Sequence, residues 1–89
     1  MKIENMTSSN GNSVPNQFII KDNDCTYFQS YNSIIVLKKE GQKTKLDEKF
    51  WNYSKTTSKY RSVFLSESTK ETQDKINSGI YELCDLNYN

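Results

Sequence analysis

The spacing of apolar residues changes near the middle of this 89-residue chain, and the change constrains the fold more than any other feature. Between Gln17 and Leu46, short runs rich in β-branched and aromatic residues are separated by turn-forming residues, which is typical of β-strands. From Tyr53 onward, apolar side chains return every three or four residues, as they do on one face of an α-helix. The pattern therefore predicts strands first and helices afterwards.

Turn-forming residues divide the first part into strands. We expect hairpin turns at 22–24 (DND) and 40–42 (EGQ), and a weaker turn at 32–33 (NS). The run 34–39, IIVLKK, is the most apolar in the chain and is predicted to be a central strand. The segment 43–46 is polar, and its lysines are predicted to protect an exposed edge of the sheet.

The second part contains two sets of helix signals. The residues predicted to share the buried face of a first helix are Tyr53, Thr57, Tyr60 and Phe64. Ser54 is predicted to cap the start of that helix. A capping box at 68–71 and a stop at Gly79 delimit a second, mostly polar helix of about 69–78, with Ile76 as its main apolar contact. Residues 80–84 alternate again and form a candidate closing strand.

These signals define the fold class as α+β, with a small antiparallel β-meander of three to four strands, two C-terminal helices and a candidate closing C-terminal strand. We assign residues 17–89 to this single domain. Residues 1–16 are rich in Ser, Asn, Gly and Thr and are expected to be flexible. Because the chain is short and only 34% hydrophobic, every large apolar side chain is expected in the core, and Cys25 and Cys84 are expected there as small hydrophobic residues.

The residue types that carry most enzyme chemistry are scarce. The chain has no histidine, which removes the commonest general acid–base group and the commonest metal ligand. Cys25 and Cys84 cannot complete a four-ligand zinc site, and neither lies in a motif that activates a thiolate. We therefore expect no enzymatic activity, no metal and no cofactor. No apolar run approaches the roughly 18 residues of a membrane span, and no leader is evident, so the expected location is a reducing cytoplasm.

Charge is unevenly distributed, although the net charge is only +1. Residues 38–61 contain eight basic and three acidic side chains, whereas residues 67–85 contain five acidic and two basic ones. If strand 43–46 and the first helix are adjacent, their cations form one basic patch. The candidate partner-binding residues are Lys43, Lys45, Lys49, Trp51, Lys55, Thr56, Ser58, Lys59 and Arg61. In this hypothesis the hydroxyls donate to a phosphate, and Arg61 binds a phosphate or carboxylate through two hydrogen bonds.

A purely structural interpretation of the same residues stays open. Lysines on a polar strand and on the outer side of a helix often serve only solubility. In a chain this small, Trp51 and Tyr53 are candidates for the core rather than for stacking on a ligand, and Tyr60 and Phe64 are stronger candidates for the core. The acidic second helix is most simply a solvated face.

Four segments resemble a known family when they are taken in order: NQFII, YFQSYNSIIV, FWNYSKTTSKYRSVFL and KINSGIYELCDLN. They are similar to short proteins of unknown function that are encoded by bacteriophages and mobile elements of low-GC bacteria. The resemblance covers about residues 13–87, with W-x-Y-S-x-T-T-S-K-Y as its most specific part. It implies that the protein acts in the host bacterial cytoplasm. By analogy with phage proteins of this size, it implies action against host defences, as in anti-CRISPR proteins.

Three classes of function can be compared. Binding and inhibition of a host bacterial protein, such as a CRISPR or other defence nuclease or a nucleoprotein complex, requires only a rigid surface. The alternative is a nucleic-acid-binding accessory protein that uses the basic region 43–61, although a net charge of +1 is low for that role. An enzyme is the weakest hypothesis, because no nucleophile and base are paired in a motif. No membrane partner is expected, and a homodimer through the sheet edges stays open without a specified interface.

Overall fold

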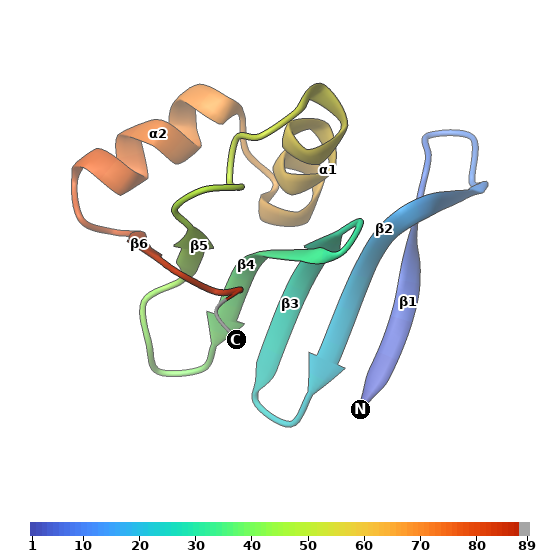
Figure 1. Cartoon of the computed structure of the whole chain (residues 1–89), viewed down its shortest axis with the longest axis horizontal. Coiled ribbons are helices and arrows are strands. Elements are labelled where there is room, and N and C mark those ends of the chain that lie inside the picture. Colours follow the sequence, from blue (N-terminus) through green and yellow to red (C-terminus); the bar gives the residue numbers. More distant parts are fainter. Residues whose placement is uncertain (88–89) are drawn as a thin grey trace.

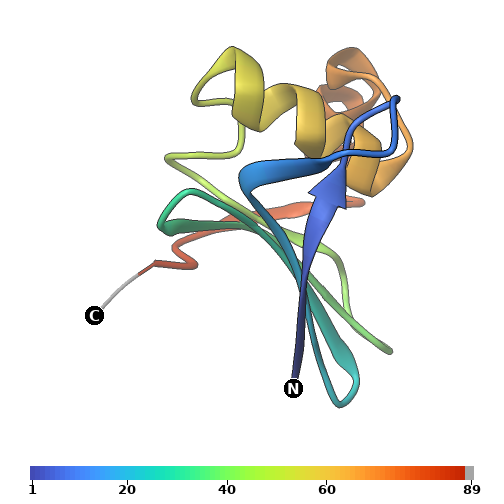
Figure 2. The same ribbon diagram turned by 90° about the vertical axis from the view of Figure 1, so that its right-hand side faces the viewer.

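Six strands form a single sheet, and two helices lie on the same side of it (Figures 1 and 2). The computed structural model describes residues 1–87. In chain order the elements are β1 (Lys2–Thr7), β2 (Ser13–Asp22), β3 (Cys25–Ser30), β4 (Ser33–Lys39), β5 (Lys45–Asp47), α1 (Lys55–Leu65), α2 (Thr69–Asn77) and β6 (Glu82–Cys84). The predicted α+β class is confirmed, and the sheet has more strands than the meander that we expected.

The strands stand in the sheet in chain order, and neighbours are antiparallel except for β5 and β6, which are parallel. The prediction that segment 43–46 lies at an exposed edge is wrong, because the chain returns from α2 and pairs β6 with the far side of β5. The edges are therefore β1 and β6. The candidate closing strand at 80–84 is present as the shorter β6.

The first sixteen residues are not the flexible segment that their composition predicts. β1 pairs with β2 from Lys2 to Asn5, and β2 already begins at Ser13. Hydrogen bonds to the neighbouring strand hold this segment in place, and Met6 is the side chain of β1 that reaches the core. A strand is recognised in a sequence from apolar residues that recur at every second position. Only one side chain of this polar segment contacts the core, so no such repeat is visible.

The turns lie close to their predicted positions. Asn23 and Tyr31 have positive φ angles of 54° and 56°, which allow the chain to reverse within two residues after β2 and after β3. The register between β3 and β4 slips by one residue after Phe28. As a result Ile35 and Val36 are both buried, with exposed fractions of 1% and 0%, although they are consecutive on one strand.

Local capping signals set the helix boundaries as predicted. Ser54 accepts a hydrogen bond from the Thr57 N–H at 3.1 Å, and Ser68 forms a capping box with Glu71. Gly79 follows α2 with a φ angle of 82°, which suits a helix stop. The expected burial of Tyr53 is wrong: α1 begins at Lys55, and the Tyr53 side chain is 70% exposed.

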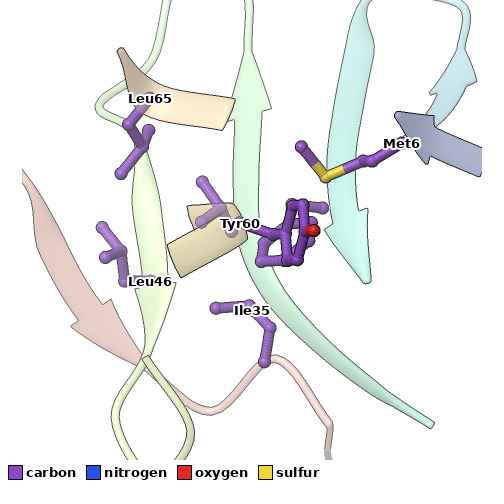
Figure 3. Packing of buried hydrophobic residues seen from close by; sticks show 7 residues of the cluster. Met6, Ile35, Leu46, Tyr60 and Leu65 are labelled. Atoms are coloured by element: carbon purple, nitrogen blue, oxygen red, sulfur yellow. The ribbon is translucent and has the colours of Figure 1, made fainter. Parts of the chain in front are cut away.

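The core lies between the sheet and α1. Its buried hydrophobic residues are Met6, Phe28, Ile35, Val36, Leu46, Tyr60 and Leu65. Figure 3 shows Tyr60 reaching from α1 into the middle of this cluster, near Met6 and Ile35. Phe64 is partly buried and stacks on Phe28 with 5.7 Å between ring centroids. Cys25 and Cys84 are only partly buried and lie outside this cluster, which corrects their assignment to the core.

Candidate functional site

The nine candidate residues do not form one basic patch. Lys43 lies in the turn between β4 and β5, at the end of the sheet away from α1 (light green in Figure 1), whereas Lys55 and Lys59 lie on α1. Lys45 lies within β5, between two strands, and is partly buried. The cations of strand and helix therefore do not converge. Lys49 precedes α1 in the connecting loop and is exposed.

Arg61 is the largest fully buried side chain among the described residues. It connects its own helix α1 to the loop before α1 and to the start of α2. Its Nη1 donates to the Trp51 carbonyl oxygen and to Asn52 Oδ1 at 3.3 Å, and its Nη2 donates to Thr69 Oγ1 at 2.7 Å. The guanidinium carbon lies 5.1 Å from the centroid of the Trp51 ring. Burial lowers the pKa of Arg61, and the charge of Glu67 acts in the opposite direction. This arrangement corrects the expectation that Arg61 binds a partner, because its donors face the interior.

Asp47 fixes the start of the loop that leads to α1. Its Oδ2 accepts from the backbone N–H groups of Lys49 and Phe50 at 3.0 and 2.9 Å. Its Oδ1 accepts from the Leu86 N–H at 2.9 Å and from Asn87 Nδ2 at 3.0 Å. Four N–H donors compensate the cost of burying a carboxylate that is only 1% exposed. The loop is thus held rigidly at its beginning.

A groove of about 250 Å³ opens beside this loop, and we call it the tyrosine groove. The residues that line it are Ser30, Tyr31, Asn32, Ser33, Ile35, Phe50, Tyr53 and Thr57. None of these side chains is charged. Tyr31 and Tyr53 are 50% and 70% exposed, and the Tyr53 ring meets the Phe50 ring edge-on at 5.4 Å. The groove therefore presents two aromatic rings to solvent on a fixed support.

Hydroxyl groups line the buried part of the tyrosine groove. Ser30 Oγ and Thr57 Oγ1 share a hydrogen bond of 2.9 Å, and both residues are buried. The Ser54 hydroxyl donates to Thr57 Oγ1 at 3.1 Å. Because these hydroxyls already have partners, an entering group gains little from hydrogen bonding there. The arrangement suits an apolar or aromatic group rather than a charged one.

Exposed lysines lie on α1 and in the loop before it. Lys49, Lys55 and Lys59 form no ion pair with any residue between positions 1 and 87. The remaining candidates, Trp51, Thr56 and Ser58, are partly buried. Ser58 donates to Asn52 Oδ1 at 2.6 Å, so its hydroxyl is directed into the protein. Of the nine predicted residues, Lys49, Lys55 and Lys59 are therefore the exposed cations of α1 and of the loop that precedes it.

Neither a metal centre nor an activated Cys84 thiol is found among the described residues. Within residues 1–87, no group of three or more His, Cys, Asp or Glu side chains is placed to hold a metal ion. Burial raises the pKa of the Cys84 thiol, while Lys45 acts in the opposite direction, so the reactive thiolate is disfavoured. Neither α1 nor α2 is long and apolar enough to cross a membrane.

Sequence reasoning missed Tyr31, Phe50 and Asp47 as parts of this site. An aspartate just before a loop is a known signal for side-chain capping of backbone N–H groups, so Asp47 was accessible to prediction. Tyr31 and Phe50 give no such signal, because their position beside Tyr53 depends on how α1 packs on β3.

The fold and the groove define a small α+β protein with a neutral, aromatic surface groove. The chain belongs to DUF8033, a family of unknown function whose model matches residues 1–79. This match confirms that the chain belongs to a family of unknown function; it includes the N-terminal strand and ends before β6. Comparisons with curated proteins and with solved structures find no match.

Proposed function

We propose that this protein binds and inhibits a host bacterial protein through the tyrosine groove and the exposed lysines of α1. In the full form of the proposal the protein comes from a bacteriophage or mobile element and acts in the host cytoplasm. Its target is then a defence nuclease, such as a CRISPR nuclease, or a nucleoprotein complex. The provenance rests on the sequence resemblance, and the binding mode rests on the surface described above.

The tyrosine groove carries the proposal. Tyrosines dominate the energetics of many protein interfaces, because a rigid aromatic ring buries a large area at a small entropic cost. Tyr53 belongs to the loop that Asp47 and Arg61 hold in place, and Tyr31 is exposed in the turn between β3 and β4. A side chain of the partner that enters the groove would contact both rings and displace water from apolar surface.

The lysines indicate the charge of the partner. Lys55 and Lys59 are separated by one helical turn and have no acidic partner among the described residues. Exposed cations on α1 without an acidic partner attract an acidic surface and increase the rate of association. We therefore propose a partner with an acidic rim around an apolar or aromatic side chain.

Affinity capture from the host lysate, with the bound proteins identified by mass spectrometry, tests the proposal. Tyr53→Ser combined with Tyr31→Ser should abolish capture of the specific partner, and Lys55→Glu combined with Lys59→Glu should weaken it strongly. Lys43→Glu is the matched control, because Lys43 is an exposed lysine at the other end of the sheet. Retention of the same partner by both double variants would exclude this surface.

A nucleic-acid-binding accessory role is the second candidate, because exposed tyrosines next to lysines also suit stacking on unpaired bases. Binding of fluorescent single-stranded DNA and RNA should then weaken with salt, with a slope of log affinity of about −0.7 per phosphate contact. Tyr53→Ser should lower the affinity, and Lys43→Glu should not. No binding at low salt would eliminate this candidate.

A further inference from the structure

The sheet face that points away from the helices carries large apolar side chains that no helix covers; we call it the open face. Strand pairing places Ile3, Ile20, Tyr27 and Leu37 in one row across β1 to β4. A second row places Phe18 and Ile34 on either side of Gln29. Phe28, the neighbour of Tyr27, points the opposite way and stacks on Phe64 of α1.

The apolar side chains of the open face are partly or largely exposed. Ile3 is 60% exposed, and the other five are intermediate, whereas Phe28 and Val36 on the covered face are fully buried. In a chain that is only 34% hydrophobic, six large apolar side chains outside the core form a substantial patch. Contiguous apolar surface with a polar rim marks an interaction site more often than chance exposure.

The C-terminal segment covers one end of the open face and leaves the rest free of the described chain. Asn87 accepts from the Ile34 N–H at 2.7 Å and donates to the Ile34 carbonyl oxygen at 2.9 Å. Figure 1 shows this segment passing across β4 and β5, while β1, β2 and β3 stay clear of it. The uncovered part is therefore centred near β3.

The charges of the open face point to a second copy of this chain as the occupant. Asp22 and Lys39 lie on either side of Cys25, in the row next to Tyr27. Lys45 and Glu82 continue the row of Leu37 onto β5 and β6. Two acidic and two basic side chains balance each other, so this rim favours neither a charged protein nor an anionic membrane, which requires excess positive charge.

We propose that two copies pack open face to open face around a two-fold axis that runs along β3. Such an axis lays β2 of one copy over β4 of the other, as in an aligned β-sandwich. Ile20 then faces Leu37 of the second copy, away from the end of the open face that the C-terminal segment covers. At the rim, Asp22 faces Lys39 of the second copy, and the same contact recurs by symmetry. One axis thus matches apolar side chains with apolar ones and opposite charges with each other.

This dimer is independent of the proposed function, because its residues differ from those of the tyrosine groove. A net charge of +1 gives little repulsion between copies. The contact also covers the centre of the open face on both copies. The dimer then has four layers, with two sheets in the middle and the helices of each copy on the outside.

Sedimentation equilibrium of the full chain over a wide concentration range tests the proposal. The wild type should have the mass of a dimer at high concentration. Asp22→Lys and Lys39→Asp should each raise the dimer dissociation constant by about tenfold or more, because each places like charges opposite each other twice. The double variant D22K/K39D should restore the dimer, and this rescue separates the proposed contact from any general loss of folding.

Two further variants complete the test. Leu37→Lys should give a monomer, whereas Val63→Lys should leave the dimer unchanged, because Val63 is an exposed apolar residue of α1 on the other side of the sheet. Circular dichroism of each variant identifies any that are unfolded. A wild type that sediments as a monomer at all concentrations would overturn the proposal. Failure of the charge exchange to restore the dimer, with both single variants folded, would also overturn it.

Discussion

Tyr27 and Phe28 are consecutive residues of β3, and the two faces of the sheet give them different surroundings. Phe28 is fully buried beneath α1, whereas Tyr27 lies on the open face and is partly exposed. The same contrast holds for Val36 and Leu37 on β4. Consecutive apolar residues therefore show that a strand has two apolar faces, but they do not show which of them the rest of the chain covers.

The largest expected effect is the difference in stability between alanine variants of Phe28 and Tyr27. Phe28→Ala should lower the free energy of unfolding by about 3 to 5 kcal/mol, because it removes a buried ring from the core. Tyr27→Ala should cost about 1 kcal/mol at low protein concentration, since part of the ring already contacts water. Urea unfolding monitored by circular dichroism gives both values. Equal losses at low concentration would show that the chain itself covers the open face.

Substitutions of Arg61 test how much a buried cation contributes to the stability of the helix-covered side of the sheet. Arg61→Ala should lower the free energy of unfolding by about 3 kcal/mol, because the Trp51 carbonyl oxygen and the Thr69 hydroxyl lose their donor and a cavity remains. Arg61→Lys should recover less than half of this loss, since one ammonium group cannot reproduce the planar fork. Thermal unfolding of both variants measures these losses. Lys59→Ala, at an exposed position of the same helix, is the control.

Replacing a buried polar residue on the covered face should increase the free energy of unfolding instead of lowering it. Gln17 is fully buried beside Ser30, and neither atom of its amide has a hydrogen-bond partner among the described residues. Gln17→Leu should raise the free energy of unfolding by about 1 kcal/mol, because the apolar side chain avoids the cost of burying an amide. A lower unfolding midpoint in urea would show that the amide has a partner in solution.

The smallest expected effect is a dependence on pH. Burial raises the pKa of Glu67, but hydrogen bonds from Tyr81, Lys75 and Thr72 together outweigh it, so the net shift is downward. A carboxyl group with a lowered pKa stabilises the fold above its unfolded pKa, and this contribution is lost as the pH falls through the folded pKa. Between pH 7 and pH 3, the wild type should therefore lose more stability than Glu67→Gln. Parallel curves of urea midpoint against pH would contradict this.

Local signals in the sequence predicted local structure well. Ser54 and Ser68 mark helix starts through a hydroxyl and a nearby N–H, so a few residues contain all the necessary information. The central position of 34–39 and the burial of Tyr60 follow equally from the apolar pattern.

Features that depend on packing between distant segments were not predictable in the same way. β6 moves β5 from the edge to the interior of the sheet, and nothing within 43–46 indicates that pairing. Arginine is rarely buried, so general tendencies assign Arg61 to the surface, and only the combined acceptors of the loop before α1 and of α2 explain its position. The tyrosine groove likewise forms only when the loop, the β3–β4 turn and α1 are assembled.

The Asp47 carboxylate has a consequence for the order of events during synthesis. Its Oδ1 receives donors from Leu86 and Asn87, which follow it by 39 and 40 residues. When Asp47 leaves the ribosome, those donors have not yet emerged from it, so the carboxylate stays hydrated and β5 lacks its parallel neighbour. The meander of β1 to β4 has local contacts and can form early, whereas the final arrangement of the loop beside the tyrosine groove must wait for the segment after α2. A nascent chain that has not reached this point would display its tyrosines without a fixed groove between them.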